Sequence, residues 1–180
     1  QFRESLNVEA VDQAIELLRE AKRVEFYAMG NSTVVALDAQ HKLFRFRIPS
    51  VAHTDASMQS MAAELLGPQD VAVFISSSGQ PPELVRAATL ARDRGAAVLA
   101  ITASKSPLAK KATVCVPVDH NEDSATFLAM ISRILHLLVV DMMAVGVAVR
   151  RDAGSSVPRS TQPGETPGDH PPGMLISHVL

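Results

Sequence analysis

Hydrophobic and polar positions along the chain follow two periods, one typical of amphipathic helices and one of buried strands. Residues 8–21 carry apolar side chains at helical spacing, and Asn7 stands where it would cap the start of that helix. Residues 71–75 form an unbroken apolar run, typical of a strand buried on both faces of a parallel sheet. Such patterns alternate in steps of roughly 25 residues, which predicts an α/β domain with a parallel sheet.

The other expected elements rest on the same evidence. Further strands are predicted at 24–29, 48–52, 97–102 and 113–118. Further helices are predicted after the turn at 30–32, over 55–66, from Pro81 and Pro82 to Gly95 and over 124–149. Pro49 places its strand at a sheet edge, because proline has no N–H to donate to a neighbouring strand. The sheet therefore has five strands.

Two side chains within these elements are expected to be structural rather than catalytic. The helix after residues 30–32 carries Val34, Leu37, His41 and Phe44 along one face. Because that face is otherwise apolar, we expect His41 to be a packed, hydrogen-bonded histidine rather than a catalytic base. Cys115, in the middle of the last strand, is expected to be an inert buried thiol.

The helix predicted at 124–149 is apolar almost all round. Its apolar side chains are Phe127, Met130, Ile131, Ile134, Leu135, Leu138, Val139, Met142 and Met143. One domain face cannot cover them all, so we expect a homodimer through this helix; the alternative is a helix wholly inside a thick sandwich. Its most apolar stretch, 134–149, is shorter than the roughly 20 residues of a membrane span, and no membrane association is predicted.

The composition changes near residue 151. Residues 154–173 are rich in Pro and Gly, with Ser and Thr between them, and such a segment does not build a packed element. We therefore predict one domain over 1–151 and a flexible or extended tail over 152–180. The chain opens at Gln1 rather than methionine, which indicates a piece of a longer or processed gene product.

Composition and charge exclude several classes of protein. Apolar residues make up 47% of the 180 residues and the net charge is −2, which rules out disorder over the whole chain. The 17 Lys and Arg against 19 Asp and Glu leave no basic excess for nucleic acid. One cysteine forms no internal disulfide, so a reducing cytoplasm is expected, and no group of His, Asp and Glu has metal-ligand spacing.

Candidate chemistry lies where two of the expected strands end. The residues in question are Gly30, Asn31 and Ser32 after the first strand, and Ser76, Ser77, Ser78, Gly79 and Gln80 after the central one. Both loops lead into helices, whose first turns expose unpaired N–H groups and a positive dipole end. In open parallel sheets, ligands bind beyond the carboxyl ends of the strands, where the strand order reverses. Hydroxyls and amides there form an anion cradle that phosphate commonly fills.

A simpler interpretation of these loops stays open. A Ser-rich stretch before a proline is often only a turn and a helix cap. Two such loops at successive strand ends nevertheless favour phosphate binding. Neither a P-loop motif nor a full G-x-G-x-x-G motif occurs in the sequence, which argues against nucleotide binding.

The arrangement resembles the sugar isomerase (SIS) domain, a flavodoxin-like three-layer αβα sandwich that binds phosphosugars. Family members carry a G-x-G-x-S-like loop, matched by residues 28–32, and an S-x-S-G-x-T loop, matched by residues 76–81. Further stretches are similar to RpiR-type transcriptional regulators, especially their HexR-like branch: 38–46, 101–103 with 106–109, and 132–137. The resemblance extends over residues 8–151, and the tail lies outside it.

The resemblance implies an effector-sensing domain that is not an enzyme and needs no cofactor. By position, Ser32 and Ser76 match the effector-contacting serines of the family, and Ser78 with Gly79 completes the phosphate loop. A helix-turn-helix domain would precede residue 1 and bind operator DNA, and a bound phosphosugar would change its affinity for DNA. HexR-like members respond to 2-keto-3-deoxy-6-phosphogluconate.

Three residues depart from the family pattern. Ala28 replaces the first glycine of the first loop, which is mild if its φ is negative. Pro81 replaces the threonine of the second loop and offers neither a hydroxyl nor an N–H. Gln80 stands where HexR-like proteins commonly have arginine, so a charge-assisted contact is lost. A different effector, or weaker binding, is expected.

An aldose–ketose isomerase is the main alternative function. Phosphosugar isomerases of this fold need a general acid and base, usually Glu and His, and His53, His120 and Glu122 lie near strand ends. We favour a structural interpretation of the segment around Glu122, in which Asp123 or Ser124 caps the long helix. A third possibility is a non-catalytic SIS module that acts through protein contacts.

Overall fold

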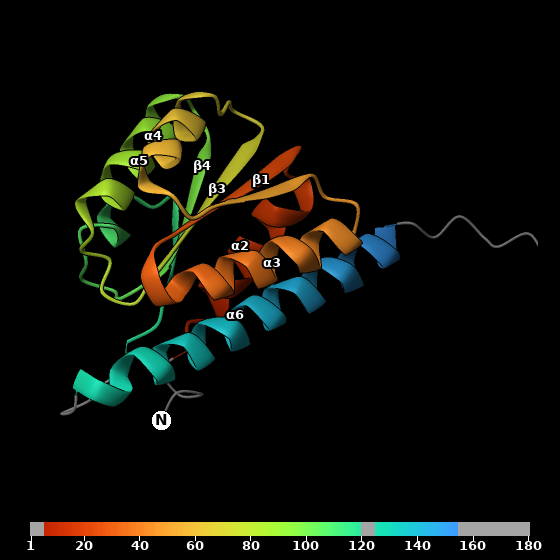
Figure 1. Cartoon of the computed structure of the whole chain (residues 1–180). Coiled ribbons are helices and arrows are strands. Elements are labelled where there is room, and N and C mark those ends of the chain that lie inside the picture. The colour runs from red at the N-terminus through yellow and green to blue at the C-terminus, as the bar shows by residue number, and fades with distance from the viewer. Residues whose placement is uncertain (1–5, 120–124, 155–180) are drawn as a thin grey trace, which may run out of the picture.

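One parallel sheet lies between two layers of helices in the computed structural model, which describes residues 6–119 and 125–154 (Figure 1). The strands are β1 (Arg23–Ala28), β2 (Ser50–His53), β3 (Asp70–Ser76), β4 (Ala97–Thr102) and β5 (Val114–Pro117). Their order is β2-β1-β3-β4-β5, and all neighbouring pairs are parallel. The predicted five-stranded sandwich is confirmed.

Helices cover both faces of the sheet (Figure 1). One layer holds α4 (Ala56–Glu64) and α5 (Pro82–Asp93), and the other holds α2 (Val8–Glu20), α3 (Thr33–Arg45) and α6 (Ala125–Gly154). Two short 3-10 turns complete the described elements: η1 (Gly30–Ser32) and η2 (Ala109–Lys111).

The central strand β3 shows why the sheet needs two cores. Val73 and Ile75 point into the core under α2, α3 and α6, whereas Phe74 points into the core under α4 and α5. All three are 0% exposed. The continuous apolar run at 71–75 is therefore buried on both faces, as its sequence predicts.

Helix caps and the sheet edge also follow the sequence. The Asn7 side chain accepts a hydrogen bond of 3.0 Å from the Ala10 N–H at the start of α2. Asp55 caps α4 by accepting the N–H groups of Ser57 and Met58. β2, which follows Pro49, pairs only with β1 and forms one edge of the sheet.

The packed face of α3 differs from the prediction. Val34, Leu37 and Phe44 are 52%, 52% and 70% exposed, and His41 is exposed with them. The expected packed histidine is therefore wrong. The buried face carries Val35, Ala36, Ala39 and Leu43. Its alanines allow the helix to approach the sheet closely, and an apolar pattern alone does not reveal which of two apolar faces is inside.

α6 is longer than predicted and lies against α2 and α3. It continues to Gly154, beyond the predicted domain end at 151, whereas residues 155–180 of the predicted tail lie outside the described residues. By length and composition, Met130–Asp152 is long and apolar enough to cross a bilayer, contrary to the sequence estimate. However, 39% of its most apolar window is buried within the fold, as in a helix that packs on one side of a domain.

The last strand holds the single cysteine. Cys115 is half-buried in β5 rather than fully enclosed. Burial, helped by the charge of Asp119, raises the pKa of its thiol. A raised pKa keeps the thiol protonated at neutral pH, which agrees with the expected lack of reactivity.

The order of the strands determines where loops gather. The chain runs from β1 outward to β2 and returns on the other side of β1 to form β3, so the strand order reverses between β1 and β3. We call the two ends of the strands the carboxyl edge and the amino edge of the sheet. The loops after β1 and β3 leave side by side at the carboxyl edge, where ligands of such sheets bind.

Candidate functional site

Two loops at the carboxyl edge enclose a cavity of about 190 Å³, which we call the serine pocket. Ala28 pairs with Ile75 at the strand ends, so both loops begin at the same level. The pocket is lined by Met29, Asn31, Ser32, Ser76, Ser77, Ser78, Pro81, Ser132 and Arg133. Five of the residues predicted from the sequence thus surround one cavity, whereas Gly30, Gly79 and Gln80 are not among its lining residues.

Ser32 precedes α3 but does not cap it. Its side chain accepts no hydrogen bond from the first turn, in contrast to Asn7 and Asp55 at the starts of α2 and α4. Gly30 has a φ of +56°, and its carbonyl accepts a hydrogen bond of 2.8 Å from the Thr33 hydroxyl. Ser32 therefore lines the pocket without capping the helix.

The second loop is held by its own hydroxyls. The Gly79 N–H donates to Ser76 Oγ at 3.1 Å, and the Gln80 N–H donates to Ser78 Oγ at 3.3 Å. Both oxygens keep their own O–H to donate, because a hydroxyl accepts and donates at once. Gln80 thus shapes the loop through its backbone.

Gly79 explains why the second loop needs a glycine. Its φ is +60°, and a Cβ there would lie 2.3 Å from Ser106 Oγ and 2.5 Å from Thr102 Oγ1. The Gly79 carbonyl also accepts a hydrogen bond of 3.2 Å from the Leu108 N–H. Gly79 is therefore a structural residue behind the pocket that lets two loops approach closely.

Arg133 supplies the charge that the second loop lacks. It lines the pocket from α6 beside Ser132, which is 2% exposed, while Arg133 itself is half-buried. Neither residue is predicted as a site residue from the sequence. A polar Ser-Arg pair in an otherwise apolar helix was the available signal. No carboxylate is among the lining residues, so the described pocket favours an anion.

Backbone dipoles add to this field. α3 and α5 both begin at the pocket, at Thr33 and Pro82, and their positive ends face it. Pro81 and Pro82 contribute no N–H groups, so α5 offers fewer donors than a helix without prolines would. Hydroxyls and Arg133 must carry more of the binding on that side.

Gln59 of α4 holds the end of β1 behind the first loop. It is 0% exposed, and its side-chain N–H groups donate to the carbonyls of Ala28 and His53 at 3.0 and 2.9 Å. This pair of bonds positions the residue that precedes Met29 at the entrance of the pocket.

His53 takes part in a buried cluster, not in the serine pocket. Its Nε2 lies 3.1 Å from Glu25 Oε2, and the Tyr27 hydroxyl donates to the same oxygen at 2.6 Å. Burial raises the pKa of Glu25, but the hydrogen bonds from His53 and Tyr27 and the charge of Arg23 outweigh it and hold the pKa below its usual range. Burial raises the pKa of Tyr27.

The structure does not describe the other residues that the sequence offers as catalytic or capping candidates. His120, Glu122, Asp123 and Ser124 lie outside the described residues. Within the described part of the chain, no group of three His, Cys, Asp or Glu side chains is placed to hold a metal ion.

Comparison with known proteins identifies the class of domain. The family model of the SIS domain matches residues 17–146, so the chain belongs to the SIS domain family. The carboxyl-edge position of the serine pocket between β1 and β3 agrees with this fold.

Curated relatives include a transcriptional regulator and a bifunctional protein. The chain is 44% identical over 146 residues to the HTH-type transcriptional regulator HexR of Pseudomonas aeruginosa, covering 81% of this chain and 51% of that protein. It is 54% identical over 153 residues to the bifunctional protein glk of Burkholderia pseudomallei, covering 85% and 24% respectively. The chain therefore spans a quarter to a half of these relatives. The predicted resemblance to HexR-like regulators is confirmed.

A solved structure shares the fold. The NanR protein of Vibrio vulnificus, in complex with ManNAc-6P, superposes with a TM-score of 0.76 at 22% identity. The match covers 89% of this chain and 65% of that one.

Proposed function

We propose that the chain is the effector-sensing domain of a bacterial transcriptional regulator of sugar metabolism. In this proposal the serine pocket binds a phosphosugar in the cytoplasm without converting it. The observation that carries the proposal is the meeting of two hydroxyl-bearing loops and one arginine around a single cavity. Such a set of donors matches the oxygens of a phosphate group.

The roles of the lining residues follow from their chemistry. Ser32, Ser76 and Ser78 donate hydroxyl hydrogen bonds to phosphate oxygens, and Arg133 neutralises the charge. Arg133 thereby takes the part that the HexR-like arginine, replaced here by Gln80, would play. The volume of about 190 Å³ suits one small phosphorylated molecule. Similarity to HexR favours 2-keto-3-deoxy-6-phosphogluconate as that effector.

The response to the effector needs a DNA-binding partner domain. We propose that a helix-turn-helix domain preceding residue 1 binds operator DNA, as the name of the HexR relative suggests. The effector would change that domain's affinity, either upward or downward.

A homodimer would present two such DNA-binding domains to paired half-sites. Exposed apolar side chains support this assembly: Met130, Ile131, Ile134, Leu138, Val145 and Val149 on α6, with Val34, Leu37 and Phe44 on the adjoining α3. An outward face of this kind on two neighbouring helices is typical of a subunit interface.

The effector proposal is tested by thermal melting of the chain with a panel of sugar phosphates, sugars and inorganic phosphate. We expect a rise in melting temperature with a sugar phosphate, the largest with the keto-deoxy acid phosphate, and none with the unphosphorylated sugars. Phosphorus NMR of the same mixtures should show no conversion. Conversion of an aldose phosphate to a ketose phosphate would support the isomerase alternative, and no shift with any sugar phosphate would contradict binding.

The dimer is tested by light scattering after gel filtration. The chain should elute with the mass of two copies, and Ile134→Glu should elute with the mass of one. A matched change on the polar surface, Glu83→Gln, should leave the dimer intact. A wild-type chain with the mass of one copy at micromolar concentration would contradict this part of the proposal.

A further inference from the structure

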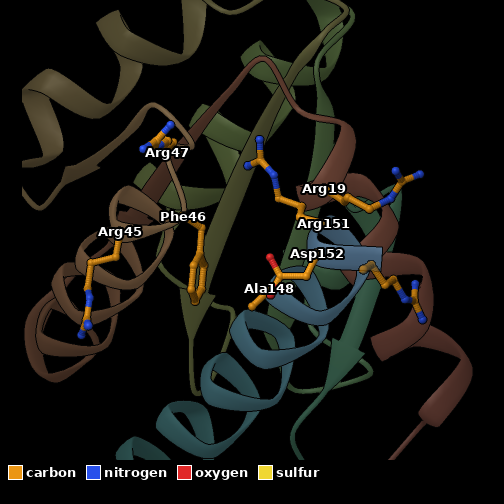
Figure 2. A pocket seen from close by; sticks show the side chains of 8 residues that line it. Arg19, Arg45, Phe46, Arg47, Ala148, Arg151 and Asp152 are labelled. Atoms are coloured by element: carbon orange, nitrogen blue, oxygen red, sulfur yellow. The ribbon is translucent and has the colours of Figure 1, made fainter. Parts of the chain in front are cut away.

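The largest cavity among those described lies at the amino edge of the sheet, at the far end of the strands from the serine pocket. It measures about 770 Å³ and is lined by Arg19, Arg45, Phe46, Arg47, Ala148, Arg150, Arg151 and Asp152 (Figure 2). We call it the arginine cleft. Arg19, Arg45 and Arg151 lie in the last turns of α2, α3 and α6, so three helix ends meet there.

Two of the five arginines form ion pairs within the fold. Arg19 pairs with Glu16 and Glu20 at 2.9 and 2.8 Å on α2. Arg150 pairs with Asp12 and Glu16 and thereby fastens α6 to α2. These ion pairs explain both residues without a ligand.

The other three arginines have no such explanation. Arg45, Arg47 and Arg151 are exposed, and within the described part of the chain their side chains form neither a hydrogen bond nor an ion pair. Cations often stand at helix ends to offset the dipole, but these guanidinium groups bond to none of the described terminal carbonyls. Figure 2 shows Arg47 and Arg151 on the two sides of the opening, with the Phe46 ring between α3 and α6. Asp152 is the only acid in the lining.

Arg47 stands where the backbone prefers glycine. Its φ is +60°, the single positive φ of a non-glycine residue in the described chain. The turn after α5 has the same last two backbone hydrogen bonds and uses Gly95, with a φ of +86°. In both turns the next residue donates its N–H to a carbonyl five positions back, from Ile48 to Leu43 and from Ala96 to Ala91. The turn after α5 has glycine at the position of positive φ, which glycine adopts readily, whereas the turn after α3 has an arginine there.

This contrast indicates that the Arg47 side chain, rather than its backbone, has a use. A non-glycine residue in this conformation is disfavoured and is commonly retained where the side chain serves a site. The side chain forms no hydrogen bond or ion pair with the described residues. Binding of a molecule from outside the described fold therefore best explains why an arginine stands at this position.

We propose that the arginine cleft is a second anion site, which binds a small organic molecule carrying two or more phosphate groups. Guanidinium groups bind phosphate oxygens in pairs, and Arg47 and Arg151 stand at the ends of α3 and α6, which one such molecule would bridge; the Arg45 side chain points away from Arg151 (Figure 2). The Phe46 ring supplies an apolar wall for the organic part. A volume of about 770 Å³ lies in the range of small-molecule sites.

A nucleic acid fits the cleft less well. A duplex requires a row of phosphate contacts along an extended basic face. Here Arg45, Arg47 and Arg151 line one cleft rather than a row, and the chain as a whole carries a net charge of −2.

The test uses calorimetric titration of the 180-residue chain with sodium tripolyphosphate and with a nucleoside triphosphate, at matched ionic strength. We expect binding of one molecule per chain, weakened at least tenfold by Arg47→Gly and by Arg151→Gln. The Arg47→Gly change keeps the turn, because glycine is the residue used after α5. Arg94→Gln, an exposed arginine at the end of α5, is the matched control and should bind as the wild type does.

The outcomes separate this site from the proposed function. Ser76→Ala in the serine pocket should leave tripolyphosphate binding unchanged, and Arg47→Gly should leave sugar phosphate binding unchanged. The proposal is overturned if neither probe binds at millimolar concentration, or if Arg47→Gly and Arg151→Gln bind both probes as tightly as the wild type. Displacement of bound tripolyphosphate by a 20-base-pair duplex at lower concentration would overturn it in favour of nucleic acid.

Discussion

The two edges of the sheet collect polar groups in opposite ways. At the carboxyl edge, the serine pocket is small and relies on hydroxyls, helix starts and one half-buried arginine. At the amino edge, the arginine cleft is wide and relies on long charged side chains at helix ends. Donors fixed by turns are pre-organised for one phosphate, whereas flexible charges attract a larger anion with less shape selectivity.

The glycines at positive φ sharpen this contrast. At the carboxyl edge, Gly30 and Gly79 allow loops that no other residue fits equally well, and the ligand groups belong to their neighbours. At the amino edge, Arg47 occupies such a conformation itself. In the serine pocket, glycines therefore provide the backbone conformation and other residues provide the ligand groups. In the arginine cleft, one residue has both the unusual conformation and the proposed ligand group.

The largest expected effect is at Gly79. Gly79→Ala places a Cβ against Ser106 and Thr102 and imposes a positive φ, so it should cost about 3 kcal/mol or more in the free energy of unfolding. Gly30→Ala is the matched control: nothing lies within 4 Å of its Cβ, and only the φ penalty of about 1 kcal/mol applies. Urea denaturation compares the two, and equal losses would contradict the close approach described for Gly79.

The next effect concerns a buried charge, which contrasts with the exposed charges of the arginine cleft. Glu25→Gln keeps one acceptor oxygen but removes the negative charge that Tyr27, His53 and Arg23 contact, and it should cost about 2 kcal/mol, whereas Arg45→Gln should cost almost nothing. Since the folded pKa of Glu25 lies below its unfolded value, its contribution is present above the unfolded pKa and is lost as the pH falls through the folded pKa.

Denaturation from pH 7 to pH 3 checks the sign of this contribution. The wild type should lose stability steeply below about pH 4.5, and Glu25→Gln should lose less over the same interval. Parallel curves for the two proteins would show that Glu25 does not carry the acid dependence.

A smaller effect tests the charge of the serine pocket. Arg133→Gln should weaken the binding of a sugar phosphate about tenfold, because one charge-assisted hydrogen bond contributes about 1.5 kcal/mol. Arg94→Gln, at the other end of α5, should bind normally. Calorimetric titration measures both affinities. An unchanged affinity in Arg133→Gln would show that the Arg133 side chain on α6 does not contribute to binding.

The smallest effect compares two turns of the same geometry. Arg47→Gly should leave the free energy of unfolding within about 0.5 kcal/mol of the wild type, whereas Gly95→Ala should lower it by about 1 kcal/mol. The Gly95 Cβ would also lie 3.2 Å from Pro68 Cγ. A large loss on Arg47→Gly would show that the arginine side chain has a structural role instead.

Much of the fold is readable from the sequence because local patterns and tertiary packing agree. The β3 run at 71–75 is apolar on both faces and is buried on both. Asn7 predicts a cap and makes one. Ser32 and Ser76 are brought to one cavity because parallel strands place their following loops at the same edge.

What the sequence does not reveal depends on contacts between distant segments. Arg133 reaches the pocket only because α6 docks against the helices that begin the chain. α3 has an apolar stripe through Leu37 that stays exposed and a second one through Ala39 that is buried, and only packing against β1 and α6 distinguishes them. The residues that line the arginine cleft are spread from 19 to 152 along the chain, so no local sequence motif predicts it.

The most direct test is a double-mutant cycle on the serine pocket, with sugar phosphate affinity measured by calorimetric titration of the wild type, Ser32→Ala, Ser76→Ala and the double variant. If one phosphate bridges both hydroxyls, each single change weakens binding, and the double change weakens it by less than the sum, with a coupling above about 0.5 kcal/mol. Wild-type protein that takes up no sugar phosphate, or two losses that add as independent terms, would contradict a shared phosphate site.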